Sequence, residues 1–266
     1  MKYNLAFKYR IYPNKDQELL INKTFGCARF VYNTILYTAN KIYEETGKNK
    51  IITPASLKSE NQFLKEVDSL ALSNAQLNVK RAFTNFFQKR AKFPKFKSKK
   101  NNVKSYTTNC VNNSIRIEEN KYLILPKLKR VKLKYHREIP KNYRIKSVTL
   151  TNSNGNYYVS VLTEFEKEIQ KNPSNNKVIG LDFSMSELFV SSENQRADYP
   201  RYFKMLEKKL KKLQKSLSRK VKFSKNWYKQ KVKISKLSIS RIVEEIFYIN
   251  YRKNCLKRIM LWLLRI

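Results

Sequence analysis

The sequence KVIGLDFSMSELFVSS, residues 177–192, places a carboxylate between two apolar runs in an otherwise strongly basic chain. An apolar run ends at Asp182, a short connection follows, and a second apolar run begins at Leu188. This pattern predicts two β-strands joined by a tight turn, with a carboxylate at the end of the first strand. An acid in this position is most often a turn or capping residue, but it is also where metal-dependent chemistry would start.

The chain as a whole is strongly basic, with 57 Lys and Arg against 20 Asp and Glu and a formal charge of +37 in 266 residues. A hydrophobic content of 41% with 13% aromatic residues is enough for a buried core, which excludes a disordered basic tail. Nucleic acid is the expected partner, because neutralising its phosphates releases counterions and drives binding. A ribosome-like or merely soluble basic protein is the alternative. A membrane surface is disfavoured because the N-terminus lacks a basic amphipathic anchor.

The cysteine and histidine content argues against a zinc site. Cys27, Cys110 and Cys255 are widely spaced and form no CxxC pair, so we expect a reducing compartment without disulfides or a zinc ribbon. His136 is expected at the surface rather than as a ligand. The first residues lack a signal-peptide core, and the apolar tail IMLWLLRI is too short to cross a bilayer. We therefore expect a cytoplasmic, nucleoid-associated protein with no membrane partner.

The first third of the chain combines one strand with helices. KYNLAFKYRIY, residues 2–12, alternates apolar and polar positions, which predicts a half-buried strand. Apolar residues recur at helical spacing over residues 21–42 and again over 68–91, and Asp16 is a candidate cap for the first helix. We therefore predict a helical bundle over residues 14–92, for which a helix-turn-helix is an alternative.

Two phenylalanines alternate with four lysines in FPKFKSKK, residues 93–100. Aromatic rings that stack on bases, next to lysines that contact phosphates, are typical of single-strand binding. An ordinary basic loop whose phenylalanines dock on the core explains the pattern equally well.

Residues 103–165 show five or six short apolar and alternating segments, with a hairpin turn at residues 151–156. Strands of this kind with basic outward residues predict a small β-barrel, which the strand at 2–12 is placed to join. The polar sequence EKEIQKNPSNN, residues 166–176, is interpreted as a domain boundary.

The segment 201–236 carries 15 Lys and Arg against one acid. Leucines at 206, 210, 213 and 217 mark one face of a helix, and lysines cover the rest. A charge run is usually a solvated face, but this imbalance favours a helix pair that binds a polyanion. Across the chain, the residues predicted to contact nucleic acid are Lys8, Arg10, Lys80, Arg81, Lys95, Lys97, Lys99, Lys100, Lys208, Lys209, Lys211, Lys212, Arg219, Lys220 and Lys222.

Six blocks in this order resemble the TnpB/OrfB family, transposon-encoded proteins related to the type V CRISPR effectors. They are YRIYPNKDQELLI (9–21), GCARFVYN (26–33), FPKFKSKK (93–100), LPKL (125–128), GLDFSM (180–185) and LEKKLKKLQKSLSRK (206–220). The resemblance implies an α+β multidomain fold: a small β-barrel (wedge) with an inserted helical bundle, followed by an incomplete RNase H-like (RuvC-type) α/β domain.

The resemblance also sets the expected domain boundaries. They are residues 1–13 for the first barrel strand, 14–99 for the helical recognition domain, 100–168 for the rest of the barrel, 177–237 for a partial nuclease domain and 238–266 for an atypical tail.

By the same resemblance, Asp182 matches the first carboxylate of a nuclease site. Such sites hold two divalent metal ions, for which Mg²⁺ is suited, and use them to cleave a phosphodiester. Ser184 replaces a glycine found in many members, a change that we do not expect to abolish metal binding.

Residues 238–266 do not resemble the family, whose second carboxylate block, zinc ribbon and third carboxylate have no counterpart in this sequence. A frameshift near residues 237–239 is one hypothesis, since the shifted frame can encode family-like sequence under permissive codon choices. A shortened paralogue with its own C-terminus is the rival, and the gene's nucleotide sequence decides between them.

We therefore expect a relative of the RNA-guided DNA endonucleases that transposons carry, which are often labelled transposases. This chain is expected to bind guide RNA and target DNA, but to hold Mg²⁺ poorly and to be catalytically incomplete, because the partners of Asp182 are absent. A nuclease-dead RNA-guided repressor and a nonfunctional pseudogene fragment are the alternatives. The sequence leaves the guide, the target and the oligomeric state open.

Overall fold

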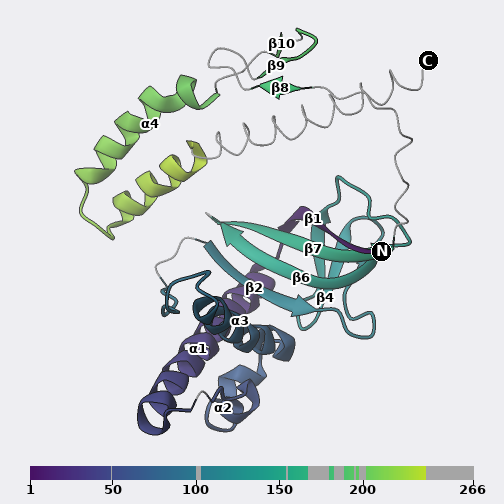
Figure 1. Cartoon of the computed structure of the whole chain (residues 1–266), viewed down its shortest axis with the longest axis vertical. Coiled ribbons are helices and arrows are strands. Elements are labelled where there is room, and N and C mark those ends of the chain that lie inside the picture. Colours follow the sequence, from purple (N-terminus) through teal and green to yellow (C-terminus); the bar gives the residue numbers. More distant parts are fainter. Residues whose placement is uncertain are drawn as a thin grey trace. The chain divides into compact units, whose positions relative to one another are not determined.

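The computed structural model describes residues 1–48, 50–99, 103–153, 155–166, 180–182, 189–194, 196–197 and 202–237. The chain divides into two compact units, Met1–Gln170 and Lys171–Ile266, which are described separately below (Figure 1). The division falls inside the polar segment 166–176. Among the described residues, no helix is both long enough and apolar enough to span a membrane.

The helices of the first unit follow its first strand, as the apolar periodicity predicts. They are α1 (Lys15–Thr46), α2 (Pro54–Glu60), the 3₁₀ helix η1 (Gln62–Lys65) and α3 (Ser69–Phe87). The side chains of Ile35, Leu36 and Leu72 are almost fully buried where α1 packs against α3. The predicted bundle is therefore present.

The ends of α1 are set by local hydrogen bonds. The Asn14 side chain accepts from the Gln17 N–H at 2.8 Å, and the Gln17 side chain accepts from the Asn14 N–H at 3.0 Å. This capping box makes Asn14 the N-cap, so the prediction of Asp16 was wrong; Asp16 lies in the first turn instead. Gly47 ends the helix with φ of 67°, a left-handed conformation that glycine adopts readily.

Helix α3 ends at Phe87, earlier than the predicted end at residue 91. Lys89 adopts a positive φ of 56°, and its N–H donates to the Phe86 carbonyl at 2.9 Å. The chain therefore turns back at once, which the helical spacing of the sequence does not reveal.

The β-structure of the first unit is one seven-stranded sheet with the order β2-β6-β7-β1-β5-β4-β3. Its strands are β1 (Lys2–Tyr12), β2 (Val103–Asn109), β3 (Arg116–Glu118), β4 (Tyr122–Leu125), β5 (Lys129–Lys134), β6 (Arg144–Ser153) and β7 (Asn156–Glu166). β1 pairs antiparallel with β7, from Lys2 opposite Glu166 to Ile11 opposite Tyr157, and also with β5. The N-terminal strand thus joins a sheet built from distant residues, with the helices inserted between, as predicted.

The sheet curls around a single core (Figure 1). Inward residues on several strands, such as Tyr9, Leu123 and Val159, are almost fully buried in one cluster. The edge strands β2 and β3 do not pair with each other among the described residues, so hydrogen bonds do not close a complete barrel. The expected barrel is therefore an open, curled sheet.

The second unit contains a small sheet and a pair of helical segments. Strands β8 (Leu181–Asp182), β9 (Phe189–Ser191) and β10 (Arg196–Ala197) form an antiparallel sheet in the order β10-β9-β8. The strand–acid–strand prediction for this stretch is thus matched by β8 and β9. Helix α4 (Tyr202–Ser218) precedes helical residues 225–237, and its predicted leucine face is partly buried. The Gln230 side chain donates to the Leu213 carbonyl at 3.2 Å and ties the two helical segments together.

Candidate nucleic-acid interface

The basic segment 93–99 is docked on α1 by one amide side chain. Asn33 donates to the Lys97 carbonyl at 3.0 Å and accepts from the Lys97 N–H at 2.8 Å. The Lys97 ammonium lies 4.1 Å from the centre of the Tyr32 ring, which adds a cation–π contact. The backbone of the segment is therefore held in a fixed place beside the bundle.

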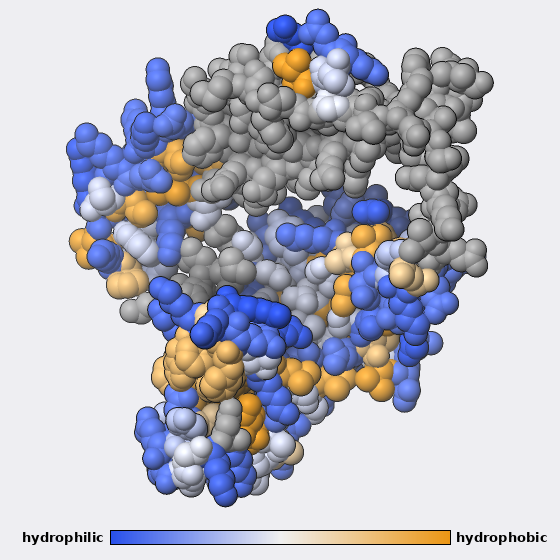
Figure 2. All heavy atoms as spheres, viewed as in Figure 1, coloured by the Kyte–Doolittle hydropathy of each residue, from blue (hydrophilic) through white to orange (hydrophobic). Residues whose placement is uncertain are grey.

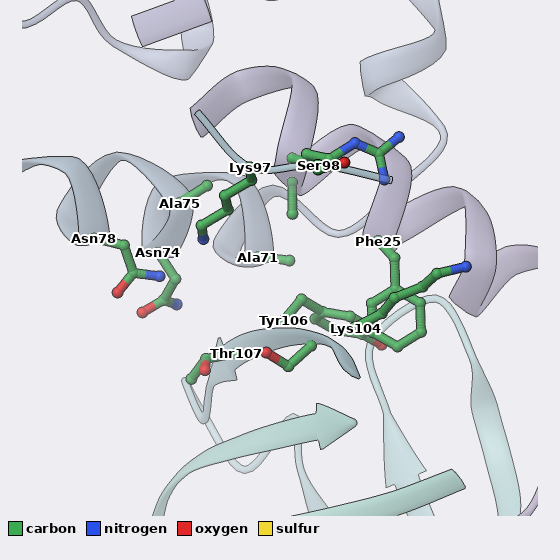
Figure 3. Close-up of a pocket in the computed structure, with 13 residues that line it drawn as sticks. Phe25, Ala71, Asn74, Ala75, Asn78, Lys97, Ser98, Lys104, Tyr106 and Thr107 are labelled. Carbon is green, nitrogen blue, oxygen red and sulfur yellow. The ribbon is translucent and has the colours of Figure 1, made fainter. Parts of the chain in front are cut away.

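This docking completes a pocket of about 200 Å³ between α1, α3, the segment and β2 (Figure 3). Its walls combine aromatic rings, amides, hydroxyls and cations. The residues that give the pocket this chemistry are Phe25, Tyr106, Asn74, Asn78, Ser98, Ser105, Thr107, Arg29, Lys97 and Lys104. Lys97 points toward Asn74 and Asn78, while Lys104 lies on the other side, beside Phe25.

The pocket carries positive charge and no acid. None of Arg29, Lys97 and Lys104 forms an ion pair with a described residue. Burial lowers the pKa of the Lys97 ammonium, because desolvation penalises its charged form. A phosphate at this position would favour the charged form and oppose that shift.

Two polar side chains, Asp68 and Thr108, fix the start of α3 against β2. The Asp68 carboxylate caps α3 by accepting from the Leu70 N–H at 3.0 Å, and it also accepts the hydroxyl of Thr108 on β2. Tyr106 is buried beside them, and its pKa is raised by burial and by the Asp68 charge. One carboxylate therefore connects the helical bundle to the sheet.

The sequence around the pocket contains no acid over a long range. Asp68 and Glu118 enclose residues 69–117, which include 11 Lys and Arg and no Asp or Glu. Asp68 itself is engaged by α3 and Thr108, so it does not neutralise these cations at the surface. This part of the molecule is suited to a polyanion.

The structure places several predicted contacts on this unit. Lys80 and Arg81 are exposed on α3, and Lys95 and Lys99 are exposed on the docked segment with Lys97. Lys100 lies outside the described residues.

Sequence reasoning missed two of the cations at the pocket. Arg29 and Lys104 lie far apart in the sequence, and no periodicity relates them. Arg29 lies in the block GCARFVYN, residues 26–33, and Lys104 follows the basic segment 93–100, so no shared pattern in the sequence indicates that the two meet.

Lys8 and Arg10 project from β1 and contact neighbouring aromatic rings. Lys8 lies 5.2 Å from the centre of the Tyr158 ring, and Arg10 lies 5.2 Å from the centre of the Tyr12 ring. Arg10 also donates to the Asn156 side chain at 2.8 Å. Both remain exposed, so their charges face solvent on the outer side of the sheet.

The predicted cations of the second unit are exposed on and after α4. Lys211 forms an ion pair with Glu207 at 2.7 Å, and the other predicted lysines of the helix, Lys208, Lys209 and Lys212, are exposed. Arg219 and Lys222 are exposed in the turn, and Lys220 is half-buried. The arrangement is a basic helical surface, as the sequence predicted.

Asp182 lies in β8 opposite Val190 of β9. The side chain of Asp182 lies outside the described part of the structure, as do residues 183–188. Among the described residues, no group of three His, Cys, Asp or Glu is placed to hold a metal ion. These residues do not supply a ligand set for Mg²⁺, and metal binding by Asp182 remains a prediction.

Removal of the Asn33 amide should release the segment that closes the pocket. In Asn33→Ala, the loss of two hydrogen bonds to Lys97 is expected to make trypsin cleavage after Lys95, Lys97 and Lys99 about tenfold faster. Limited digestion followed by mass spectrometry measures this. Asn40→Ala on the same helix is the matched control, and equal cleavage rates in the two variants would contradict the assigned role of Asn33.

Two family models match the chain. One, HTH_OrfB_IS605, is described as "Helix-turn-helix domain" and matches residues 1–48, which hold β1 and α1. The other, OrfB_IS605, is described as "Probable transposase" and matches residues 160–245. α2 and α3 follow the first match, and the second extends slightly beyond Leu237.

Curated relatives agree with these matches. "Putative RNA-guided DNA endonuclease InsQ" of Escherichia coli (strain K12) is 35% identical over 248 residues, covering 89% of this chain and 59% of the relative. "Putative RNA-guided DNA endonuclease" of Streptomyces pristinaespiralis is 30% identical over 241 residues, covering 87% and 59%. The chain thus spans about three fifths of the length of these two relatives.

A solved structure titled "Cryo-EM structure of the Cas12f1-sgRNA-target DNA complex" is 15% identical and covers 94% of this chain and 71% of its own, with a TM-score of 0.31. That likeness is too low to define the fold.

The structure described above is that of a basic, mixed α/β protein with a surface suited to a polyanion. By the family models and the curated relatives, the chain belongs to the TnpB/OrfB family.

Proposed function

We propose that this 266-residue chain binds a guide RNA and target DNA without cleaving DNA efficiently. Nucleic acid compensates the positive charge of the molecule better than any other class of partner. Its phosphates neutralise lysines and arginines, and the counterions condensed on the nucleic acid are released. The relatives' descriptions as RNA-guided DNA endonucleases support RNA and DNA as the two partners.

The observation that carries the proposal is the pocket lined by Arg29, Lys97 and Lys104. Three cations around amides and hydroxyls offer a phosphate both charge and hydrogen bonds, and the aromatic rings of Phe25 and Tyr106 add an apolar floor. The Asn33 and Asp68 hydrogen bonds hold the walls of this pocket in place before a ligand binds. Binding a ligand there then costs little additional conformational entropy.

Asp182 is the only residue of this sequence that matches the nuclease carboxylates of the family. A two-metal mechanism needs several carboxylates to hold both ions, and one ligand leaves them loosely placed. The proposed activity is therefore binding. A nuclease-dead RNA-guided repressor is the more specific form of it, and a gel shift with RNA from the transposon end tests for the complex it requires. The well-buried cores of the first unit support a folding chain over a nonfunctional fragment.

A nuclease assay tests whether the chain cleaves DNA. With Mg²⁺ and a matched guide RNA, the chain is expected to give no guide-dependent cleavage, and Asp182→Ala is expected to bind RNA within about twofold of the unchanged chain. Denaturing electrophoresis of labelled DNA reports cleavage, and a gel shift reports binding. Guide-dependent products that disappear in Asp182→Ala would overturn the proposal.

A further inference from the structure

Four phenylalanines gather where α3 ends and the chain turns back. The Phe86 ring centre lies 5.4 Å from that of Phe87 and 5.2 Å from that of Phe93. Phe83 joins them, at 6.2 Å from Phe87 and 5.9 Å from Phe93. The turn at Lys89 is what brings Phe93 back onto the helix, so the sequence pattern alone does not reveal the group. We call these four residues the phenylalanine cluster.

The phenylalanine cluster is anchored on one side and open on the other. Phe83 is 7% exposed and packs into the bundle core, whereas Phe87 is 63% exposed and Phe93 is 47% exposed. Figure 2 shows a hydrophobic area over this end of α3, with hydrophilic residues beside it. Contiguous exposed apolar surface with a polar rim is typical of a binding site rather than of a solvated face.

The charges around the phenylalanine cluster identify the kind of partner. Lys89, Arg90, Lys92 and Lys95 are all exposed within a few residues of the rings, and no acid occurs in this part of the sequence. A second copy of this chain would bring the same cations face to face, which like-charge repulsion opposes. A polyanion that also presents flat apolar surfaces satisfies both features. Unpaired nucleobases with their phosphates have this chemistry, and every base has a face that stacks on an aromatic ring.

We propose that the phenylalanine cluster is a stacking platform for unpaired bases of single-stranded nucleic acid. The exposed rings of Phe87 and Phe93 take the bases, and the surrounding lysines and Arg90 contact the phosphates. Duplex nucleic acid keeps its bases stacked on each other, so it gains only the phosphate contacts here. The inference rests on the proposed nucleic-acid binding and adds to it a preference for single strands at this position.

The substitution Phe87→Leu tests the platform, because it keeps an apolar side chain but removes the aromatic face. Fluorescence anisotropy with a labelled 15-nucleotide single strand is expected to show about tenfold weaker binding than the unchanged chain. A duplex of the same sequence is expected to bind within about twofold of the unchanged chain. Phe87→Tyr, which keeps a ring, is the matched control and is expected to retain single-strand binding. Because Phe87 is largely exposed, the thermal midpoint should not change, and this is checked for each variant.

A second variant gives an independent readout. Phe87→Trp places a fluorophore on the platform, and stacking on a base should quench its emission when a single strand is added. The unchanged chain provides the background from its own Trp227 and Trp262. RNA and DNA oligonucleotides of one sequence are tested in parallel. Quenching by only one of them identifies the kind of strand that the platform binds.

The outcomes separate this inference from the proposed function. If the unchanged chain binds both single strands and duplex but Phe87→Leu binds single strands equally well, the platform is overturned and nucleic-acid binding stands. If the unchanged chain binds neither, both proposals fail. Selective loss of single-strand binding in Phe87→Leu, with retention in Phe87→Tyr, supports the platform.

Discussion

The substitution Asp68→Ala is expected to destabilise the first unit by about 2–4 kcal/mol. Loss of an N-cap costs roughly 1 kcal/mol, and a buried hydroxyl left without a partner costs roughly 1–3 kcal/mol. Both apply here, because Asp68 caps α3 and accepts the hydroxyl of Thr108, which is 3% exposed. Urea unfolding followed by circular dichroism measures the change in the free energy of unfolding.

Two further variants establish the cause of this destabilisation. Asp68→Asn keeps an oxygen for the Leu70 N–H and an amide for Thr108, so it is expected to cost less than about 1 kcal/mol. A double-mutant cycle with Thr108→Val isolates the contact between helix and sheet. A coupling energy near zero would show that Asp68 acts only as a helix cap and does not connect the two elements.

Neutralising the pocket should remove most of the affinity for duplex DNA. The combined change of Arg29, Lys97 and Lys104 to Gln is expected to weaken binding up to about 500-fold at about 0.1 M salt, since each of the three lost phosphate contacts forfeits nearly an order of magnitude. Fluorescence anisotropy with a labelled 30-base-pair duplex measures the dissociation constant. The pocket side chains are partly exposed and not ion-paired with described residues, so the fold should be retained.

A charge-matched triple variant controls for the loss of net charge. Lys121, Lys127 and Lys141 are exposed in the loops of the same unit and do not line the pocket. Their combined change to Gln is expected to weaken binding by less than about fivefold. Equal losses in the two triple variants would mean that the chain binds through its overall charge rather than through the pocket.

The sequence predicted those parts of the fold that depend on local periodicity. The alternation in residues 2–12 correctly placed β1 in the sheet, and the spacing of apolar residues correctly placed α1 and α4. The end of α1 at Gly47 was also predictable, because glycine favours the left-handed conformation that ends a helix. These features follow from residues close together in the chain.

Features that depend on tertiary contacts or on competing local signals were not predicted. Asn14 and Asp16 are both good caps, and the capping box between Asn14 and Gln17 decides between them; the Asn-x-x-Gln spacing is a local signal that the interpretation of Asp16 overlooked. The pocket unites Arg29 with Lys104, which no spacing rule connects. Of the two interpretations of residues 93–100, docking on the core applies to Phe93, which packs against Phe83 and is 47% exposed, and single-strand binding stays a prediction.

The salt dependence of duplex binding tests whether the pocket recognises phosphates. For the unchanged chain, the logarithm of the association constant should fall linearly with the logarithm of the KCl concentration, and the pocket variant of Arg29, Lys97 and Lys104 should reduce that slope by up to about 2.7. The charge-matched control should leave the slope nearly unchanged. A slope that is the same in the pocket variant and the unchanged chain, or binding that does not respond to salt, would contradict phosphate recognition by this pocket.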